Sequence, residues 1–151
     1  MKAILLTLAA CTFLSCAQTP SASETASKSP SQEAEAVIME DVSNDDFARL
    51  MVDQPNALLL DVRTPEEWDE GHLEGAAHAD YWGDEAAFQA AMDAIPRDRP
   101  ILVYCAGGGR SGLTAKELVE AGHREVYNLE HGIGGWIAEG RPVVTGPPAQ
   151  E

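Results

Sequence analysis

Two short runs of the chain are continuously apolar apart from one acid, ALLLDV at 57–62 and ILVYC at 101–105. A continuous apolar run of this length is typical of a strand that is buried on both faces of a parallel sheet. A shorter extended segment at 76–79 and the run VYNL at 126–129 are interpreted as further strands. The hydrophobic pattern therefore predicts four strands.

Amphipathic stretches separate these strands. Apolar residues recur at helical spacing in NDDFARLMV and EAAFQAAMDAI, which follow the candidate N-caps Ser43 and Asp84. A shorter helix is predicted to begin after Thr64, which has Glu67 as a capping-box acid, and to end at Gly71.

Two more helices are predicted in the second half of the chain. One is SGLTAKELVEAG at 111–122, and the other lies around GWIAEG at 135–140. The apolar stripe of the first would consist of Leu113, Ala115, Leu118 and Val119. Strands that alternate with helices predict an α/β domain with a mostly parallel central sheet. Ligands bind such sheets at the carboxyl ends of the strands, where Cys105 is expected to lie.

The first residues have the pattern of a secretory signal, because Lys2 precedes an apolar stretch that is too short to span a membrane. FLSCAQ resembles the lipobox of bacterial lipoproteins, which predicts removal of residues 1–15 and lipidation of Cys16. LAAC, ending at Cys11, also fits the lipobox letters but would leave an apolar region of only about eight residues. We expect export to the periplasmic face of a bacterial membrane; a soluble periplasmic protein with an ordinary cleaved signal is the alternative.

Composition divides the rest of the chain. Residues 16–36 are rich in Ser, Ala, Pro and Glu and contain no large apolar residue, so we expect a flexible tether that is lipidated at Cys16. One folded domain is predicted at 37–144 and a disordered tail at 145–151.

The formal net charge of −15 argues against nucleic acid and anionic membrane surfaces as partners, since both attract clustered Lys and Arg. Membrane attachment is expected through the lipid anchor alone. No histidine pair has the spacing of a metal site, so no metal and no cofactor is expected; the histidines are His72, His78, His123 and His131.

The segment CAGGGR at 105–110 carries the candidate chemistry. Its three glycines, Gly107, Gly108 and Gly109, permit a backbone nest whose N–H groups converge on an anion. The helix beginning near Arg110 and the guanidinium itself would stabilise a thiolate and lower the pKa of Cys105. Cys105 is thus predicted to be a nucleophile whose product is held as an anion: a phosphate, an arsenate or a second sulfur atom.

Four segments together closely resemble single-domain rhodaneses, the sulfurtransferases: DVRTPEEW at 61–68, GHLEGA at 71–76, VYCAGGGRSG at 103–112 and GGW at 134–136. The resemblance covers about residues 40–142 and implies a rhodanese-like three-layer domain, a sheet flanked by helices. In that family the active-site cysteine opens a six-residue loop, as CAGGGR does here. Related phosphatases and arsenate reductases have one more residue between Cys and Arg, so the resemblance favours sulfur transfer.

The resemblance also implies a two-step reaction. Cys105 attacks the outer sulfur of a donor such as thiosulfate and keeps it as a persulfide. It then passes the sulfur to cyanide, a thiol or a protein acceptor.

The resemblance assigns roles to the loop and to the DVR segment. The amides of the loop hold the persulfide, Arg110 supplies positive charge, and Ser111 caps the helix. Asp61, Arg63 and Glu67 are expected to be structural, with Arg63 paired to Glu67 or a nearby acid. The loop residues are Ala106, Gly107, Gly108, Gly109 and Arg110.

Other interpretations of Cys105 stay open. The single basic residue in the loop is compatible with a non-catalytic sulfur carrier or a thiol redox sensor. A phosphatase, an arsenate reductase, acyl transfer with His131, and an inert buried cysteine are less favoured. Trp68, Trp82 and Trp136 are expected to pack in the core or at its rim, and one of them could line the acceptor's approach.

Overall fold

The computed structural model describes residues 36–147. The predicted signal peptide, the lipidation site Cys16, the tether up to residue 35 and residues 148–151 of the predicted tail lie outside the described residues. In the part that is described, no helix is long and apolar enough to cross a membrane.

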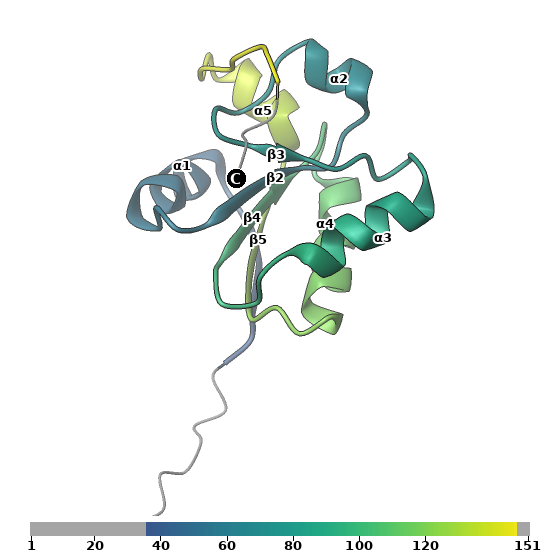
Figure 1. Cartoon of the computed structure of the whole chain (residues 1–151). Helices are drawn as coiled ribbons and strands as arrows, with labels where there is room; N and C mark the ends of the chain where they lie inside the picture. Colours follow the sequence, from purple (N-terminus) through teal and green to yellow (C-terminus); the bar gives the residue numbers. More distant parts are fainter. Residues whose placement is uncertain (1–35, 148–151) are drawn as a thin grey trace, which may run out of the picture. The chain divides into compact units, whose positions relative to one another are not determined.

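Strands and helices alternate along the described chain, as the sequence predicts (Figure 1). The elements are β1 (Ile38–Val42), α1 (Asn44–Asp53), β2 (Leu58–Asp61), α2 (Pro65–Asp69), β3 (Ala77–His78), α3 (Glu85–Ala94), β4 (Ile101–Tyr104), α4 (Gly109–Glu120), β5 (Glu125–Leu129) and α5 (Gly132–Ala138).

The strands form one parallel sheet in the order β1-β5-β4-β2-β3. This confirms the predicted α/β class and its four strands. The additional strand, β1, lies at an edge of the sheet, and its residues Met39, Glu40 and Asp41 are exposed. Because β1 is not buried on both faces, it lacks the apolar run that identified β2 and β4.

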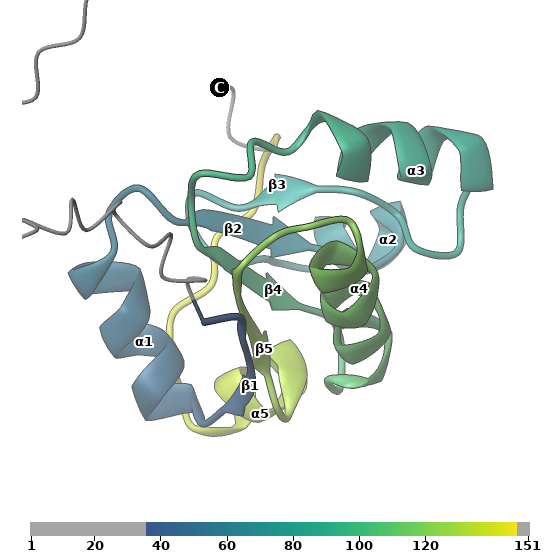
Figure 2. The same ribbon diagram turned by 90° about the horizontal axis from the view of Figure 1, so that it is seen from below.

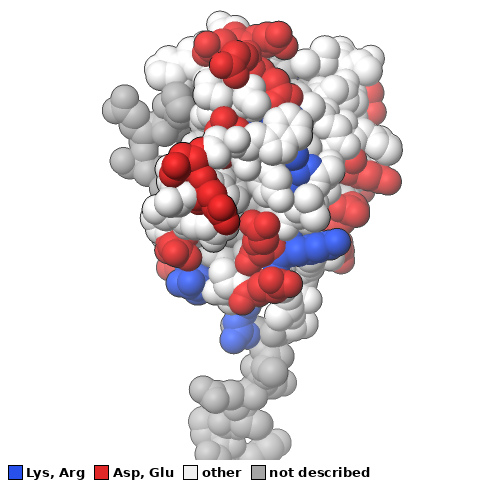
Figure 3. Space-filling view, turned by 90° about the vertical axis from the view of Figure 1, so that its right-hand side faces the viewer, with Lys and Arg blue, Asp and Glu red and all other residues white. Residues whose placement is uncertain are grey.

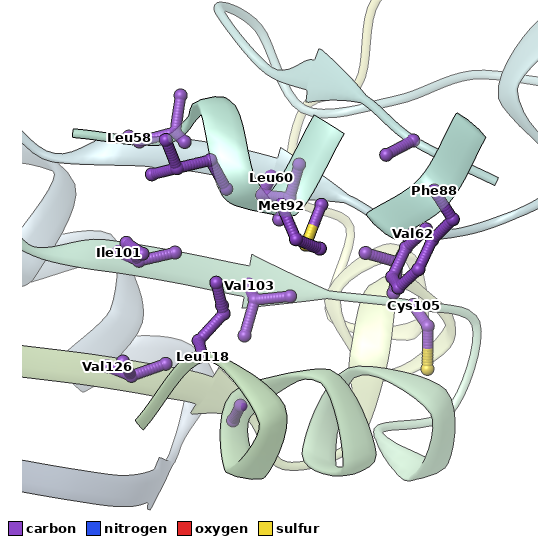
Figure 4. Packing of buried hydrophobic residues seen from close by; sticks show 13 residues of the cluster. Leu58, Leu60, Val62, Phe88, Met92, Ile101, Val103, Cys105, Leu118 and Val126 are labelled. Atoms are coloured by element: carbon purple, nitrogen blue, oxygen red, sulfur yellow. The ribbon is translucent and has the colours of Figure 1, made fainter. Parts of the chain in front are cut away.

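Helices cover both faces of the sheet and give three layers (Figures 1 and 2). On one face α3 and α4 pack against Leu58, Leu60 and Val62, and Figure 4 shows this cluster with Cys105 at its edge. On the other face, α1 and α5 pack against Leu59 and neighbouring residues of β4 and β5. Alternate residues of β2 thus enter opposite cores, as a doubly covered strand requires.

Capping side chains fix the starts of the first three helices. Ser43, Thr64 and Asp84 each accept a hydrogen bond from the backbone N–H three residues ahead, and Glu67 completes the capping box of α2. All three N-caps were predicted from the sequence. Each satisfies an N–H group that the helix cannot pair internally.

The predicted apolar stripe of α4 is only partly correct. Ala115 and Leu118 are buried, but Leu113 is 48% exposed, and the buried face also contains Ser111 and Thr114. Two polar residues take core-facing positions because this face of α4 begins beside the cysteine loop, where their hydroxyls find partners.

The chain returns to α2 after α5. The Val144 N–H donates to the carbonyl of His72, and Trp68 Nε1 donates to the carbonyl of Gly146 at 2.9 Å. Gly146 belongs to the segment predicted to be a disordered tail, so contacts with α2 extend beyond the predicted domain boundary at residue 144.

Candidate active site

Cys105 follows directly after β4, at the carboxyl end of the sheet, and only 2% of the residue is exposed. Figure 4 shows its sulfur directed toward the first part of α4. The start of α5 supports the loop from behind. The N–H groups of Ile133 and Gly134 donate to the carbonyls of Cys105 and Ala106 at 2.8 and 3.0 Å. Cys105 is therefore set on backbone that the start of α5 holds in place.

The three loop glycines serve different purposes. Gly108 has φ +88, and a Cβ there would lie 2.1 Å from the carbonyl oxygen of Glu130. A Cβ on Gly107 or Gly109 would meet no atom within 4 Å. The left-handed turn thus requires glycine only at Gly108, which corrects the expectation that all three provide the freedom for the nest.

The sulfur lies among hydrogen-bond donors. The Ser111 hydroxyl is 3.3 Å from Cys105 Sγ, and the amides of Ser111, Gly107 and Gly108 also point to it. Burial alone would raise the pKa of the thiol. These donors outweigh burial and lower the pKa of Cys105 below its usual value.

Ser111 does not cap the helix, contrary to the prediction. Helix α4 begins at Gly109, its N-cap is Gly108, and Ser111 lies buried in the first turn. Its hydroxyl donates to Cys105 Sγ or to the Gly108 carbonyl, 3.2 Å away. Because the helix begins two residues before Ser111, this hydroxyl lies within the first turn, where it faces the sulfur and not the end of the helix.

The Ser111 hydroxyl and the loop amides form a cradle of donors around Cys105 Sγ. Arg110 lies at the rim of this cradle and is held by Glu67. Its two terminal nitrogens each donate to a different carboxylate oxygen of Glu67, both at 2.7 Å. Glu67 also accepts from the Thr64 N–H at 3.0 Å. The Arg110 hydrogen bonds are the main cause that lowers the pKa of Glu67 to about 2. Glu67 thus supports the cysteine loop directly.

Trp82 covers the other side of this arginine. The Arg110 guanidinium lies 4.0 Å from the centroid of the Trp82 indole, a cation–π contact. Trp82 is 67% exposed, whereas Trp68 and Trp136 are buried. The sequence had left open which tryptophan lies near the loop, because Trp82 precedes Arg110 by a strand and a helix.

Arg63 pairs with Asp61, the nearby acid, and not with the Glu67 carboxylate. Its Nε and Nη2 donate to Asp61 at 3.0 and 2.7 Å, and its remaining N–H groups reach the carbonyls of Glu67 and Gly71, both at 2.8 Å. Although burial opposes the charge, Asp61 raises the pKa of Arg63. Arg63 thereby fixes α2 and the backbone of Glu67.

Within residues 36–147 no group of three or more His, Cys, Asp or Glu could hold a metal ion. The His131 side chain is 71% exposed beside Glu130, so it is turned toward solvent. The Sγ contacts instead come from Ser111, the loop amides and Arg110, whose pKa is raised chiefly by Glu67 and also by Cys105. Such an arrangement of donors can hold a thiolate, or a second anionic atom bonded to it.

Known proteins resemble this chain to different extents. Residues 43–139 match the family model described as Rhodanese-like domain. A sulfurtransferase of Allochromatium vinosum is 29% identical over 107 residues, 71% of this chain and 96% of that protein. A tRNA uridine(34) hydroxylase of Chlamydia pneumoniae is 39% identical over 93 residues, which are 59% of this chain but 28% of the hydroxylase.

A solved structure points the same way. The polysulfide-sulfur transferase homodimer of Wolinella succinogenes has a TM-score of 0.57 and 27% identity, and the match covers 73% of this chain and 80% of that one. The similarity to the sulfurtransferase and to the polysulfide-sulfur transferase supports sulfur transfer as the general chemistry, whereas the match to the hydroxylase shows that such domains also occur within larger proteins of other function. Since the family match runs from the N-cap of α1 to the end of α5, the chain belongs to the rhodanese-like domain family.

Proposed function

We propose that the protein is a sulfurtransferase that carries sulfane sulfur as a persulfide on Cys105. The thiolate attacks the outer sulfur of a donor, the donor's S–S bond breaks, and the donor leaves as sulfite or a thiolate. An acceptor thiolate or cyanide then attacks the outer sulfur of the persulfide and restores the Cys105 thiolate. The observation that carries the proposal is the set of donors around Sγ, the Ser111 hydroxyl and the loop amides.

The size of the cradle supports sulfur over a larger oxyanion. Cys105 is nearly inaccessible, and four residues separate it from Arg110, one fewer than in the related phosphatases and arsenate reductases. The similar polysulfide-sulfur transferase supports sulfane donors other than thiosulfate as well.

Intact mass spectrometry of the purified mature protein tests the proposal. Incubation with thiosulfate or an organic hydropersulfide should add one sulfur atom, and cyanide should remove it. Cys105→Ser should abolish the gain. Cys16→Ser, the matched control, should retain it, and peptide mapping should place the sulfur on Cys105. A gain that persists in Cys105→Ser would refute the assignment.

A non-catalytic sulfur carrier or redox sensor is the second candidate, because Cys105 is 2% exposed and its loop has a single basic residue. Steady-state turnover separates the two. Many sulfur transfers per protein with a small thiol acceptor support the enzyme, whereas one stable loading that only a partner protein discharges supports the carrier. Release of phosphate from an aryl phosphate, or reduction of arsenate, would favour the remaining alternatives instead.

We also propose that the mature protein begins at a lipidated Cys16 and is tethered to the periplasmic face of a bacterial membrane. The lipobox-like FLSCAQ supports this. Cys16→Ser should remove the mass of the lipid and leave the signal peptide uncleaved, while Cys11→Ser should leave the mass of the lipidated mature protein unchanged. Loss of the lipid in Cys11→Ser instead would move the lipidation site to Cys11.

A further inference from the structure

The positive charge of the cysteine loop is already neutralised. Both terminal nitrogens of Arg110 bond to Glu67 at 2.7 Å, and the two side chains are 9% and 28% exposed. The pKa of Glu67 is lowered to about 2, so the carboxylate is charged at neutral pH. Arg110 also interacts with Cys105, but Glu67 balances its charge, so at short range a bound donor meets an ion pair with no net charge.

Trp82 shields this pair further from the solvent side. Its indole lies 4.0 Å from the Arg110 guanidinium and remains 67% exposed. An arriving molecule can thus contact the face of an aromatic ring beside the cradle. That surface suits an organic group better than a sulfonate oxygen.

The attraction that remains is suited to one negative charge. The loop amides and the start of α4 converge on the position of Sγ, where the transferred sulfur would carry its charge. Beyond the cradle the protein is acidic, with a formal net charge of −15, and Figure 3 shows more acidic than basic side chains on the side where α3 and α4 lie. Lys116 lines the pocket beside the loop glycines, but Asp41 and Glu130 line it too, so a second negative charge on the donor would find no excess of positive charge there.

We propose that this site takes its sulfur from singly charged organic donors, the hydropersulfides, in preference to the dianion thiosulfate. The inference rests on the proposed persulfide function. In the step, the Cys105 thiolate attacks the outer sulfur of R–S–S⁻, the S–S bond breaks, and R–S⁻ leaves with the bonding electron pair. The group R lies against the exposed face of Trp82, and the Glu67–Arg110 pair determines the preference by charge.

A pair of donors that differ in charge tests this in the full mature protein. Methanethiosulfonate and thiosulfate both transfer the outer sulfur of a sulfur–sulfonyl bond, but the first is singly charged and the second doubly charged. The rate of sulfur loading on Cys105 is measured for each donor. It is divided by the rate at which the same donor transfers sulfur to a small thiol in solution, which corrects for the intrinsic reactivity of the donor. Wild type should favour methanethiosulfonate by about tenfold, the order expected for one unmatched charge near the protein surface.

Glu67→Gln should free the charge of Arg110 and reduce this preference about tenfold, mainly by raising the rate with thiosulfate. Glu70→Gln is the matched control, because it removes the same charge from the end of α2 at an exposed position, and it should keep the wild-type ratio. An unchanged ratio in Glu67→Gln, or an equal change in both variants, would overturn the inference.

Ionic strength provides a test that needs no variant. If the dianion is repelled, added salt should speed loading by thiosulfate more than loading by methanethiosulfonate. A thiosulfate rate that falls with salt would show attraction and overturn the preference. Either result leaves the persulfide proposal standing, since that proposal fails only if neither donor loads sulfur or if loading persists in Cys105→Ser.

Discussion

Two ion pairs contact α2, and they use the same chemistry for different purposes. Asp61 and Arg63 are 0% and 5% exposed at their side chains, and each guanidinium nitrogen has a hydrogen-bond partner inside the fold. Glu67 and Arg110 have equally short bonds but border the mouth of the cysteine cradle. The first pair is a structural support because it is buried. The second pair lies where a sulfur donor would enter, so it determines the charge that the donor meets.

The second pair depends on the first. Arg63 donates to the carbonyl of Glu67, so the buried pair holds the backbone that aims the Glu67 carboxylate at Arg110. Loss of the buried pair should therefore disturb both regions. Loss of the rim pair should alter donor selection and leave most of the stability intact.

The largest effect is expected from Arg63→Met, which keeps the apolar stem and leaves the Asp61 carboxylate buried without its partner. The free energy of unfolding should fall by about 3–5 kcal/mol. Urea denaturation measures it. Arg49→Met, at an exposed pair with Asp46, should cost less than about 1 kcal/mol. Similar losses in the two variants would show that burial does not distinguish these pairs.

Gly108→Ala should have the next largest effect, because it forces a side chain into a left-handed conformation and against the Glu130 carbonyl. We expect a loss of about 2–3 kcal/mol and slower sulfur loading of Cys105. Gly107→Ala, which faces open space, should change stability by less than about 1 kcal/mol. Equal losses at both positions would mean that the loop relaxes and that the close approach at Gly108 does not constrain the cradle.

The sequence predicted the elements whose causes are local. The apolar runs at β2 and β4 and the caps Ser43, Thr64 and Asp84 each act within a few neighbouring residues. Strand β1 escaped prediction because what stabilises it is its pairing with β5, not a pattern of its own.

The same limit applies to the candidate site. The loop length and a lowered pKa of Cys105 can be predicted from CAGGGR alone, but the partners of Arg110 cannot. Glu67 is 43 positions away in the sequence, and no local pattern pairs it with Arg110 in place of Arg63. The covering position of Trp82 depends on where the β3–α3 connection lies over α4. Such contacts are set by tertiary packing.

A smaller effect concerns pH and the rim pair. The pKa of Glu67 is about 2 in the folded protein against an ordinary value of 4.5, chiefly because of Arg110. A carboxylate whose pKa is lower in the folded state stabilises the protein fully at pH values above its unfolded-state pKa. This stabilisation is lost as the pH falls toward the folded-state pKa. The pair should thus contribute about 1–2 kcal/mol that disappears between about pH 5 and pH 2.

Urea denaturation across this pH range tests the prediction. Glu67→Gln should show a flatter acid limb than wild type, since it lacks the titrating group. Glu70→Gln should follow wild type. An acid limb that stays steep in Glu67→Gln would place the linked proton on another carboxylate.

The smallest effect is expected at the sulfur itself. Burial raises the pKa of Cys105, and the Ser111 hydroxyl is the foremost of the hydrogen bonds that lower it again. Ser111→Ala should therefore move the pH profile of alkylation by iodoacetamide to higher pH and slow the reaction at neutral pH, while stability falls by less than about 1.5 kcal/mol. Thr114→Val is the control, because it removes a hydroxyl from the same helix. That hydroxyl donates to the Arg110 carbonyl and not to the sulfur, so the alkylation profile of Thr114→Val should match wild type. If Ser111→Ala also matches wild type, the loop amides alone stabilise the thiolate. The reactivity of Cys105 would then depend on the loop backbone, whereas the choice of sulfur donor would depend on the Glu67–Arg110 pair.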